Sequence, residues 1–346
     1  MKTDYVKLDF EKPLDAQLTD AAGIIKRGGL VVFPTETVYG LGASALDADA
    51  AKKIYAAKGR PSDNPLIIHI SSPEEAEKYC VTSPEYYLLA EKFLPGPLTV
   101  IMPKKDIIPK TVTGGLDTVA VRCPENEAAR VLIRLSGVPI AAPSANISGK
   151  PSPTSAEHVR EDLDGKVDMI IDGGECKIGL ESTIVKLDED DAMLLRPGAI
   201  TPQMLKEVLG SIKLDGGITK KNETDAAPLA PGMKYKHYAP RAQVYLLKGT
   251  ADKITAFLAE KLAEDGNTGV LCFDELAEKL DGKYIVPFGK TDDEGAHAKR
   301  LFKALRYFDD VEVNKIYATA VGTEGIDLAT YNRMLKASGY TIIEVN

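Results

Sequence analysis

Short apolar runs alternate with helical patterns along the first two hundred residues of the chain. Residues 15–27 place apolar side chains at helical spacing, and Gly28-Gly29 ends that helix. The run Leu30–Phe33 then predicts a buried strand, which Pro34 stops. The same patterns predict further strands at 66–70, 98–102, 119–122, 140–142, 169–171, 183–187 and 193–195, and helices at 48–57, 73–80, 85–93, 126–136 and 202–209.

A second alternating pattern begins at Gln243, after a stretch rich in Gly and Pro that carries the polar run Lys220–Asp225. It predicts strands at 244–247, 269–273, 284–287, 316–321 and 341–345, and helices at 251–264, 274–280, 294–308 and 327–337. A chain of 346 residues also exceeds what one hydrophobic core usually organises. We therefore predict an α/β protein with an open-sheet domain over 1–212, a linker over 213–241, and a smaller Rossmann-like parallel α/β domain over 242–346.

The charge balance argues against a general nucleic-acid surface. The chain has 43 Lys and Arg against 51 Asp and Glu, a formal charge of −8. We expect no tight binding to nucleic acid, because such binding needs a broad cationic surface, so any anionic ligand must meet a local basic cluster. Four scattered cysteines, and no apolar run near the roughly 18 residues of a membrane span, lead us to expect a cytoplasmic protein without membrane contact.

Common nucleotide and metal motifs fail on inspection. Gly289-Lys290-Thr291 resembles the end of a phosphate-binding P-loop, but the position that needs the first glycine holds Tyr284. The four histidines form no His-Glu-x-x-His unit, so we expect no metal site built by the protein.

Four polar segments follow or flank predicted strands: 34–42, 58–65, 142–152 and 195–198. Ligands of open α/β sheets bind beyond the carboxyl ends of strands, so we expect these segments to converge at the rim of the first sheet. Lys58 and Arg60 would suit a polyphosphate, although a basic pair is also common on surfaces. The hydroxyls and amide of 144–152 could donate to phosphate oxygens, or could form a Ser-rich turn that caps the next helix.

Two arginines and a histidine lie in or at the end of apolar strands. Arg122 needs a carboxylate or phosphate partner, and a structural salt bridge would serve as well as a ligand. Arg196 ends another predicted strand, and His69 has the pattern of a satisfied core histidine more often than of a ligand. Composition and spacing thus favour an anionic-ligand site, with a nucleotide as the first candidate, and do not identify a reaction.

The ordered set of these segments resembles the YrdC-like family, and specifically the two-domain L-threonylcarbamoyladenylate synthases. The family signature Lys-x-Arg followed by Ser-x-Asn is matched by Lys58-Gly59-Arg60 and Ser144-Ala145-Asn146. The segment 230–240 resembles the family linker, with Lys236 where an arginine is expected. Further similar blocks are 34–42, 94–99, 181–183 and 196–198.

The resemblance implies a YrdC-like twisted open sheet that makes threonylcarbamoyl-AMP and pyrophosphate from ATP, L-threonine and bicarbonate. The product would supply the threonylcarbamoyladenosine modification of tRNA through a downstream transferase. Mg²⁺ would arrive with ATP. The family roles fall on catalytic Lys58, Arg60, Ser144 and Asn146; on ATP-binding Lys58, Arg60, Asn64, Thr118, Ser144, Asn146, Ser152, Arg196, Tyr235 and His237; and on threonine-binding Thr37, His69, Arg122, Ala142 and Ser182.

We expect Tyr235 and His237 to fold over the mouth of the site and exclude water. Two other functions stay open at this point. An enzyme that forms carbamoyl-adenylate would need zinc-finger cysteines and an acylphosphatase-like segment, neither of which we find in the sequence. An RNA-binding module would need more basic and aromatic surface than this composition offers.

Overall fold

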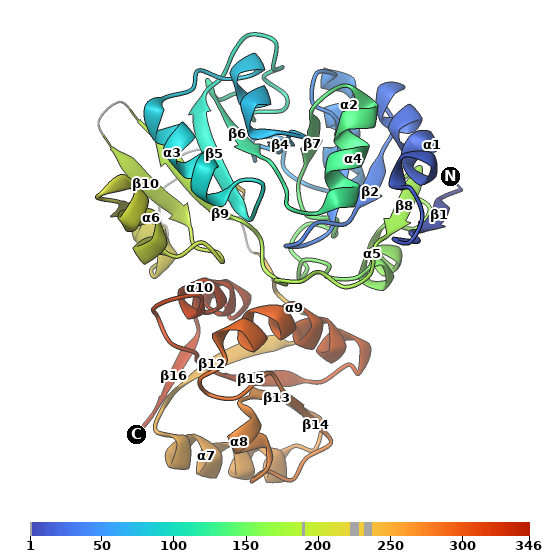
Figure 1. Cartoon of the computed structure of the whole chain (residues 1–346). Coiled ribbons are helices and arrows are strands. Elements are labelled where there is room, and N and C mark those ends of the chain that lie inside the picture. The colour runs from blue at the N-terminus through green and yellow to red at the C-terminus, as the bar shows by residue number, and fades with distance from the viewer. Residues whose placement is uncertain (1, 189–190, 222–227, 232–236) are drawn as a thin grey trace.

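The computed structural model describes residues 2–188, 191–221, 228–231 and 237–346. Figure 1 shows two α/β bodies, with the N-terminal body above the C-terminal one. Among the described residues, no helix is long and apolar enough to cross a membrane.

The N-terminal body is built on a sheet of eleven described strands in the order β1-β8-β2-β3-β7-β4-β6-β5-β9-β10-β11. Several neighbours run antiparallel, among them β2 with β3, β3 with β7, and β4 with β7. The strands are β1 (Asp4–Lys7), β2 (Val31–Phe33), β3 (Gly40–Ser44), β4 (Ile67–His69), β5 (Leu98–Pro103), β6 (Thr118–Arg122), β7 (Ile140–Ala142), β8 (Met169–Asp172), β9 (Thr183–Leu187), β10 (Ala192–Arg196) and β11 (Lys213–Leu214).

The helices of this body follow the apolar periodicity closely. They are α1 (Leu14–Lys26), α2 (Ala48–Lys58), the 3-10 helix Pro73–Lys78, α3 (Pro84–Phe93), α4 (Glu127–Ser136), α5 (Ala156–Leu163), α6 (Pro202–Leu209) and a short 3-10 turn at Gly216–Ile218. Thr201 caps α6 by accepting from the Met204 amide, and Pro202 starts it, as the sequence indicates. β1, β3, α5 and β11 were not predicted, and β11 carries the first sheet two residues beyond the predicted boundary at 212.

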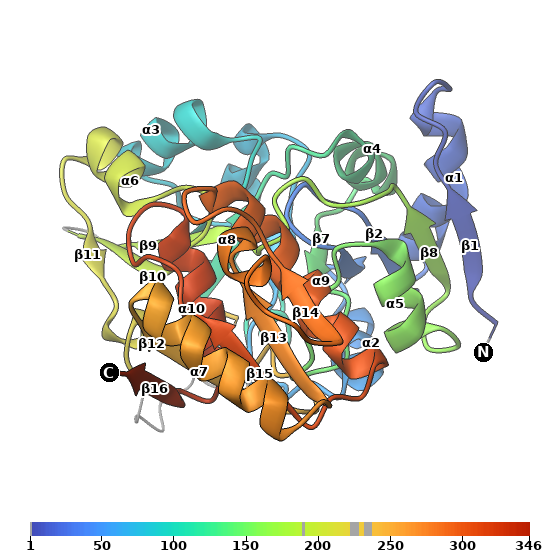
Figure 2. The ribbon, with the colours of Figure 1, turned by 90° about the horizontal axis from the view of Figure 1, so that it is seen from below.

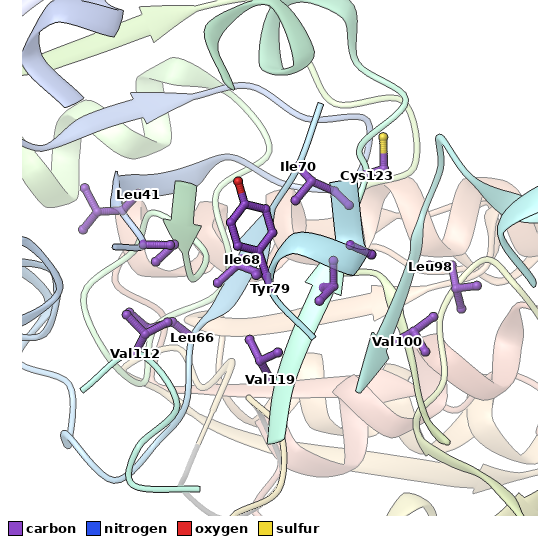
Figure 3. Packing of buried hydrophobic residues seen from close by; sticks show 14 of the residues in the cluster. Leu41, Leu66, Ile68, Ile70, Tyr79, Leu98, Val100, Val112, Val119 and Cys123 are labelled. Atoms are coloured by element: carbon purple, nitrogen blue, oxygen red, sulfur yellow. The ribbon is translucent and has the colours of Figure 1, made fainter. Parts of the chain in front are cut away.

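The two faces of this sheet differ in what covers them. Alternate strand residues such as Ile68, Val100 and Val121 pack into the main apolar core with side chains of α2 and α3 (Figure 3). The intervening residues Ile67 and Ala120 face the other way, in a small cluster with Ala230 of the linker. That second face is the one available for a ligand site.

The C-terminal body is a five-stranded parallel sheet in the order β14-β13-β15-β12-β16. Its strands are β12 (Gln243–Gly249), β13 (Thr268–Cys272), β14 (Tyr284–Pro287), β15 (Lys315–Thr319) and β16 (Ile342–Val345). Its helices are α7 (Ala251–Glu264), α8 (Asp274–Ala277), α9 (Glu294–Asp310) and α10 (Asp327–Ala337). The prediction of a smaller parallel α/β domain is confirmed.

Helices α9 and α10 lie between the C-terminal sheet and the N-terminal body (Figures 1 and 2). The apolar core of the C-terminal body accordingly includes Val38 and Leu180 of the N-terminal body. Gly179 allows the closest approach, because a Cβ there would lie 2.6 Å from Lys299 Cα, and its φ of +83° suits glycine. The C-terminal body therefore packs directly beside segments of the N-terminal sheet.

Candidate active site

A pocket lies across the second face of the N-terminal sheet. Ile67 pairs with Ala142, and His69 with Arg122, so the four side chains project from β4, β6 and β7 on the same side. The four polar segments expected to converge do so, because Thr35, Arg60, Ser144 and Arg196 all line this pocket, which also extends over the face of the sheet at Ile67. The pocket is lined by Thr35, Val38, Tyr39, Gly40, Arg60, Ile67, His69, Arg122, Ala142, Pro143, Ser144, Asn146, Ser152, Glu181, Ser182, Arg196, Pro231, His237 and Tyr238.

A buried ion pair occupies one end of the pocket. Arg122 Nη2 donates to Glu36 Oε1 at 2.6 Å, and both side chains are at most 5% exposed. Glu36 Oε2 also accepts from the backbone amides of Glu125 and Asn126. Burial favours the neutral carboxyl, but Arg122 outweighs it and holds the pKa of Glu36 below its ordinary value. Arg122 Nε has no hydrogen-bond partner within the described residues, so the arginine keeps a donor for a ligand.

His69 is a neutral ring in this pocket. Burial and then the nearby Arg122 lower the pKa of His69 to about 3. Its Nδ1 lies 3.3 Å from the Ile140 carbonyl oxygen, and its ring meets Phe33 edge-on. The imidazole therefore offers the pocket a neutral polar edge rather than a charge.

The two basic residues of the Lys-x-Arg pair have different surroundings: Lys58 binds a loop, and Arg60 lines the pocket. Lys58 is the last residue of α2, and Gly59 adopts the left-handed conformation (φ 61°) that ends the helix and releases Arg60. Arg60 lines the pocket, while its Nη2 donates to the Pro65 carbonyl at 3.0 Å. Burial lowers the pKa of Arg60 to about 10, so it stays charged at neutral pH.

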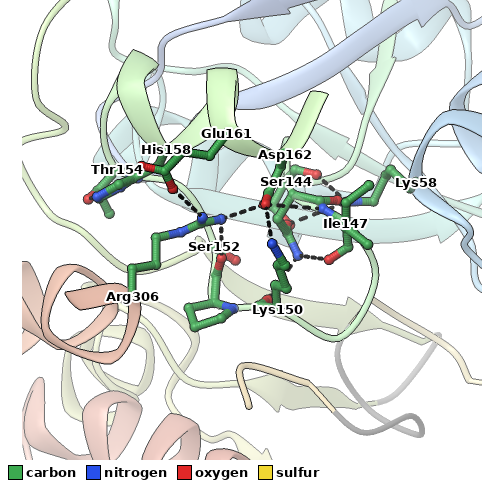
Figure 4. Close-up of polar contacts among 12 residues, drawn as sticks. Lys58, Ser144, Ile147, Lys150, Ser152, Thr154, His158, Glu161, Asp162 and Arg306 are labelled. Atoms are coloured by element: carbon green, nitrogen blue, oxygen red, sulfur yellow. Dashed lines mark hydrogen bonds and ion pairs between the residues drawn. The ribbon is translucent and has the colours of Figure 1, made fainter. Parts of the chain in front are cut away.

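Lys58 does not line the pocket but holds the loop that does (Figure 4). Its ammonium donates to the carbonyl oxygens of Ser144, at 2.5 Å, and of Asn146. Burial, followed by Arg60, moves the pKa of Lys58 well below its ordinary value. In this structure Lys58 therefore holds the two carbonyls in place and does not itself line the pocket.

The loop after β7 carries Ser144, Asn146 and Ser152 into the pocket. Ser144 Oγ donates to Asn146 Oδ1 at 2.6 Å, and Asn146 Nδ2 donates to the carbonyls of Ile147 and Lys150. The loop is also held from the C-terminal body (Figure 4). There Arg306 Nη2 of α9 donates to the Pro151 carbonyl at 2.8 Å and to Asp162 Oδ2 at 2.7 Å.

Arg196 joins the sheet to the linker. Its Nε donates to the Ser182 carbonyl at 3.1 Å, and its Nη2 donates to Ser182 Oγ at 3.2 Å. Its Nη1 donates to the carbonyl of Pro231, which also lines the pocket. Burial lowers the pKa of Arg196 to about 10, again leaving a charged group. One buried guanidinium thus fixes the position of both Ser182 and this part of the linker.

Ten of the fifteen site residues named from the sequence line this one pocket. Thr37, Asn64 and Thr118 do not, and Lys58 reaches it only through the loop that it braces. Tyr235 lies outside the described residues. Each assigned role stays a prediction, because the pocket shows proximity and not the ligand.

Several lining residues were not singled out from the sequence, chiefly Glu181 and Tyr238. Glu181 stands beside Ser182 in a family-like block, which was a usable signal that a carboxylate lies at the site. Tyr238 has a φ of 65° and stacks on Phe302 of α9 with ring centroids 5.2 Å apart. Only the packing of the two bodies reveals that contact.

The pocket contains about 50 Å³ of free volume. Sites for ligands of drug size measure about 300–1,000 Å³, so a nucleotide needs part of the wall to withdraw. Pro231, His237 and Tyr238 are the wall residues that come from the linker. Within the described residues, no group of three or more His, Cys, Asp or Glu could hold a metal ion.

Comparison with known proteins gives concordant matches over both bodies. Residues 23–198 match the Sua5/YciO/YrdC family described as "Telomere recombination", and residues 200–339 match the "Threonylcarbamoyl-AMP synthase, C-terminal domain". The chain is 50% identical to the threonylcarbamoyl-AMP synthase of Pyrococcus abyssi over 94% of this chain and 95% of that protein. It is 46% identical to the Bacillus subtilis threonylcarbamoyl-AMP synthase over 95% of each.

A solved structure matches the whole fold. The crystal structure of P. abyssi Sua5 complexed with L-threonine superposes with a TM-score of 0.92 at 47% identity, covering 100% of both chains. The structure of Escherichia coli YciO matches with a TM-score of 0.51 at 24% identity, over 57% of this chain and 95% of that one, which supports the N-terminal fold alone.

Proposed function

The chain belongs to the Sua5/YciO/YrdC family of threonylcarbamoyl-AMP synthases, and on this premise we propose that it joins L-threonine, bicarbonate and ATP into threonylcarbamoyl-AMP with release of pyrophosphate. The observation that carries the proposal is that Arg122 and Ser182 line the same pocket as Arg60 and Arg196. A carboxylate of an amino acid and a triphosphate both need buried cations, and this pocket provides them side by side. We propose that the product serves the modification of tRNA and that the reaction takes place in the cytoplasm.

The proposed reaction needs positioning rather than a covalent enzyme intermediate. The threonine amine attacks the carbon of bicarbonate with loss of water, or adds to CO2 with loss of a proton, and forms a carbamate in either case. A carbamate oxygen then attacks the α-phosphorus of ATP, and pyrophosphate leaves with the electron pair of the broken P–O bond. Holding carbamate and phosphate in line supplies most of the rate, and buried cations stabilise the charge that develops.

The threonine end of the pocket follows from the Glu36–Arg122 pair. Arg122 is oriented by Glu36, and its unpaired Nε can donate to the threonine carboxylate. His69 and Ser182 then lie within the same wall as neutral hydrogen-bonding groups. At the amino-acid end, Arg122 offers the Nε donor that its ion pair with Glu36 leaves over, which suits a single carboxylate.

Mg²⁺ fits the proposal only as a companion of ATP. Glu181 of the pocket lining and Glu36, which lies behind Arg122, are each engaged by an arginine, so neither is a free metal ligand. When bound to the phosphate oxygens, the ion would neutralise charge on the leaving pyrophosphate.

The linker would cover the mouth of the pocket. Pro231 is tied to Arg196 and Tyr238 to Phe302, on the two sides of the undescribed stretch 232–236. Withdrawal of these contacts would admit ATP, and their return would keep water from the adenylate.

Labelled bicarbonate tests the proposal directly. Label should enter an AMP-linked product only when ATP and L-threonine are both present, and carbamoyl phosphate should not replace bicarbonate. Arg60→Ala should lower the rate at least about 100-fold, because a buried charge-assisted contact is lost. Arg134→Ala, which removes an exposed arginine from a surface ion pair, should leave the rate unchanged. Incorporation without threonine would refute the proposal.

A further inference from the structure

One arginine of the C-terminal body ties together three segments of the pocket wall. Arg333 of α10 is fully buried, and its Nε donates to Glu181 Oε2 at 3.1 Å. Its Nη1 donates at 2.7 Å to the carbonyl of Pro197, the residue after Arg196. Its guanidinium also lies 5.9 Å from the centroid of the Tyr238 ring. A residue 95 to 152 positions away in sequence from these partners thus reaches the wall from the other body.

The chain of contacts continues from Arg333 to a serine in the pocket. The second oxygen of the carboxylate, Glu181 Oε1, accepts from Ser152 Oγ at 2.5 Å. Glu181 and Ser152 are both buried, and both line the pocket. Arg333, Glu181 and Ser152 are therefore connected in that order by hydrogen bonds, and the last of them lines the pocket.

The ionisation of Glu181 decides which way the serine hydroxyl points. Burial pushes the pKa of Glu181 up, but Arg333 and then Arg196 outweigh it, so its pKa lies below the ordinary value. An ionised carboxylate can only accept, so the single hydroxyl proton of Ser152 is committed to Glu181. The serine oxygen then faces the pocket with lone pairs and has no proton to donate.

A phosphate group could not form a hydrogen bond with this serine oxygen. Phosphate oxygens are acceptors, and two acceptors cannot share a hydrogen bond without a proton between them. The nucleoside part of ATP has donors instead, namely the ribose hydroxyls and the exocyclic amine of adenine. Ser152 thus suits the nucleoside and not the triphosphate.

We propose that Arg333 is a positioning residue of the C-terminal body, which acts through Glu181 to present Ser152 as a hydrogen-bond acceptor for a donor group of the nucleoside. The inference rests on the proposed function, because it takes ATP as the ligand. It gives the C-terminal body a part in nucleotide selection.

Removal of Arg333 should make nucleotide binding depend on pH. Without that cation the pKa of Glu181 rises, so the protonated form grows as pH falls, and the Ser152 proton is no longer committed. The increase in the KM for ATP that Arg333→Met causes should therefore be larger at pH 6 than at pH 8.5. The other titratable groups that interact with Glu181 are Arg196 of β10, Lys336 of α10, Lys58 of α2, and Tyr238 and His237 of the linker. Burial lowers the pKa of Lys336 to about 7, so this lysine titrates within the range in both proteins, and the variant is compared with the unaltered enzyme at each pH.

The matched control is a second ion pair between the bodies. Lys303 of α9 pairs with Glu175 at 2.8 Å, but both side chains are about 60% exposed and neither lines the pocket. Lys303→Ala should leave every kinetic constant unchanged. Arg333→Met should raise the KM for ATP at least about tenfold, with the KM for threonine within twofold, and Arg333→Lys should recover part of the loss by restoring the charge. Thermal unfolding of each variant checks that it is folded.

Nucleotide analogues identify the donor. The unaltered enzyme should bind one of 2′-deoxy-ATP, 3′-deoxy-ATP or inosine triphosphate more weakly than ATP, and Arg333→Met should lose that preference. Equal losses for ATP and threonine with a flat pH profile, or no discrimination by the unaltered enzyme, would overturn the proposal. Calorimetry with a non-hydrolysable ATP analogue measures the same effects without turnover. A chain that binds the analogue as described but makes no threonylcarbamoyl-AMP would refute the proposed function alone.

Discussion

Substitution of Glu36 measures how much burial of the Glu36–Arg122 ion pair contributes to the free energy of unfolding. In Glu36→Gln the amide must replace a carboxylate that accepts from Arg122 on one oxygen and from two backbone amides on the other. Whichever way the amide turns, its NH2 group faces a donor. One buried donor loses its acceptor, and Arg122 loses its counter-charge.

The size of the effect follows from the burial of both partners. Side-chain exposures of 5% and 1% leave no water to replace the lost partner. Removal of one member of a buried pair costs about 3–5 kcal/mol, and we expect Glu36→Gln to fall in that range. Because Glu36 also orients Arg122, the KM for threonine should rise at least about tenfold.

Asp15 provides a control with the same geometry at the surface. Arg134 Nη2 lies 2.6 Å from Asp15 Oδ1, the distance found in the buried pair, but both side chains are 55% exposed. Asp15→Asn should therefore cost less than about 1 kcal/mol. Urea unfolding of the three proteins compares the losses, and similar losses in both variants would refute the reasoning from burial.

The pH dependence of the same difference has a definite sign. The pKa of Glu36 is lowered in the folded protein, so its stabilisation is present above the unfolded pKa, about 4.3, and is lost as pH falls through the folded pKa. The stability gap between the unaltered protein and Glu36→Gln should be constant above about pH 5.5 and should shrink below pH 4. A gap that widened on acidification would contradict the assigned ionisation.

Three further predictions concern other parts of the site. Lys58→Met should raise the KM for ATP at least about tenfold in steady-state assays, because the loop at Ser144 loses its brace and the ammonium contacts with two carbonyls. His69, with a pKa of about 3, should contribute no inflection to the pH profile of the threonine KM between pH 6 and 8.5, and an inflection that disappears in His69→Asn would contradict this. Gly179→Ala should destabilise the docking of the two bodies more than Gly174→Ala, as measured by protease sensitivity of the linker. Both glycines have a φ of +83°, but only at Gly179 would the new Cβ meet backbone of the other body.

The regular elements were predictable wherever the apolar period was unbroken. The helix 202–209 and the strands 140–142 and 183–187 lie where the sequence predicts them, because caps and β-branched runs are local signals. β3 was missed because Gly40-Leu41-Gly42 has the composition of a turn. It is a strand for a tertiary reason: a Cβ on Gly42 would lie 2.6 Å from Ile140 Cγ2, so only glycine lets the β3 backbone approach its neighbours here.

The convergence of the four polar segments was predictable from their places at strand ends. The spread of the pocket over the face of the sheet was not, because local periodicity identifies a strand but not its direction. The partner of Arg122 was also left open between a ligand and a salt bridge. In the fold Nη2 donates to Glu36, which confirms the salt bridge, while Nε has no partner among the described residues and its ligand stays a prediction. The contact of Arg333 with Glu181 spans 152 positions and two bodies, and no local pattern carries such information.

The distribution of charge explains how an acidic protein can hold a polyanion. The whole chain carries −8, yet the pocket wall contains Arg60, Arg122 and Arg196 against a single lining carboxylate, Glu181. That carboxylate is already engaged by Arg333, so the positive excess is directed at the ligand. Because buried charges are screened only weakly by salt, ATP affinity should change little between 50 and 300 mM salt, unlike a surface nucleic-acid contact. Buried arginines without enough buried carboxylates would destabilise the empty fold, and a bound anion removes that cost. The same imbalance therefore links nucleotide binding to stability, and ATP should raise the unfolding temperature more in the unaltered protein than in Arg196→Met.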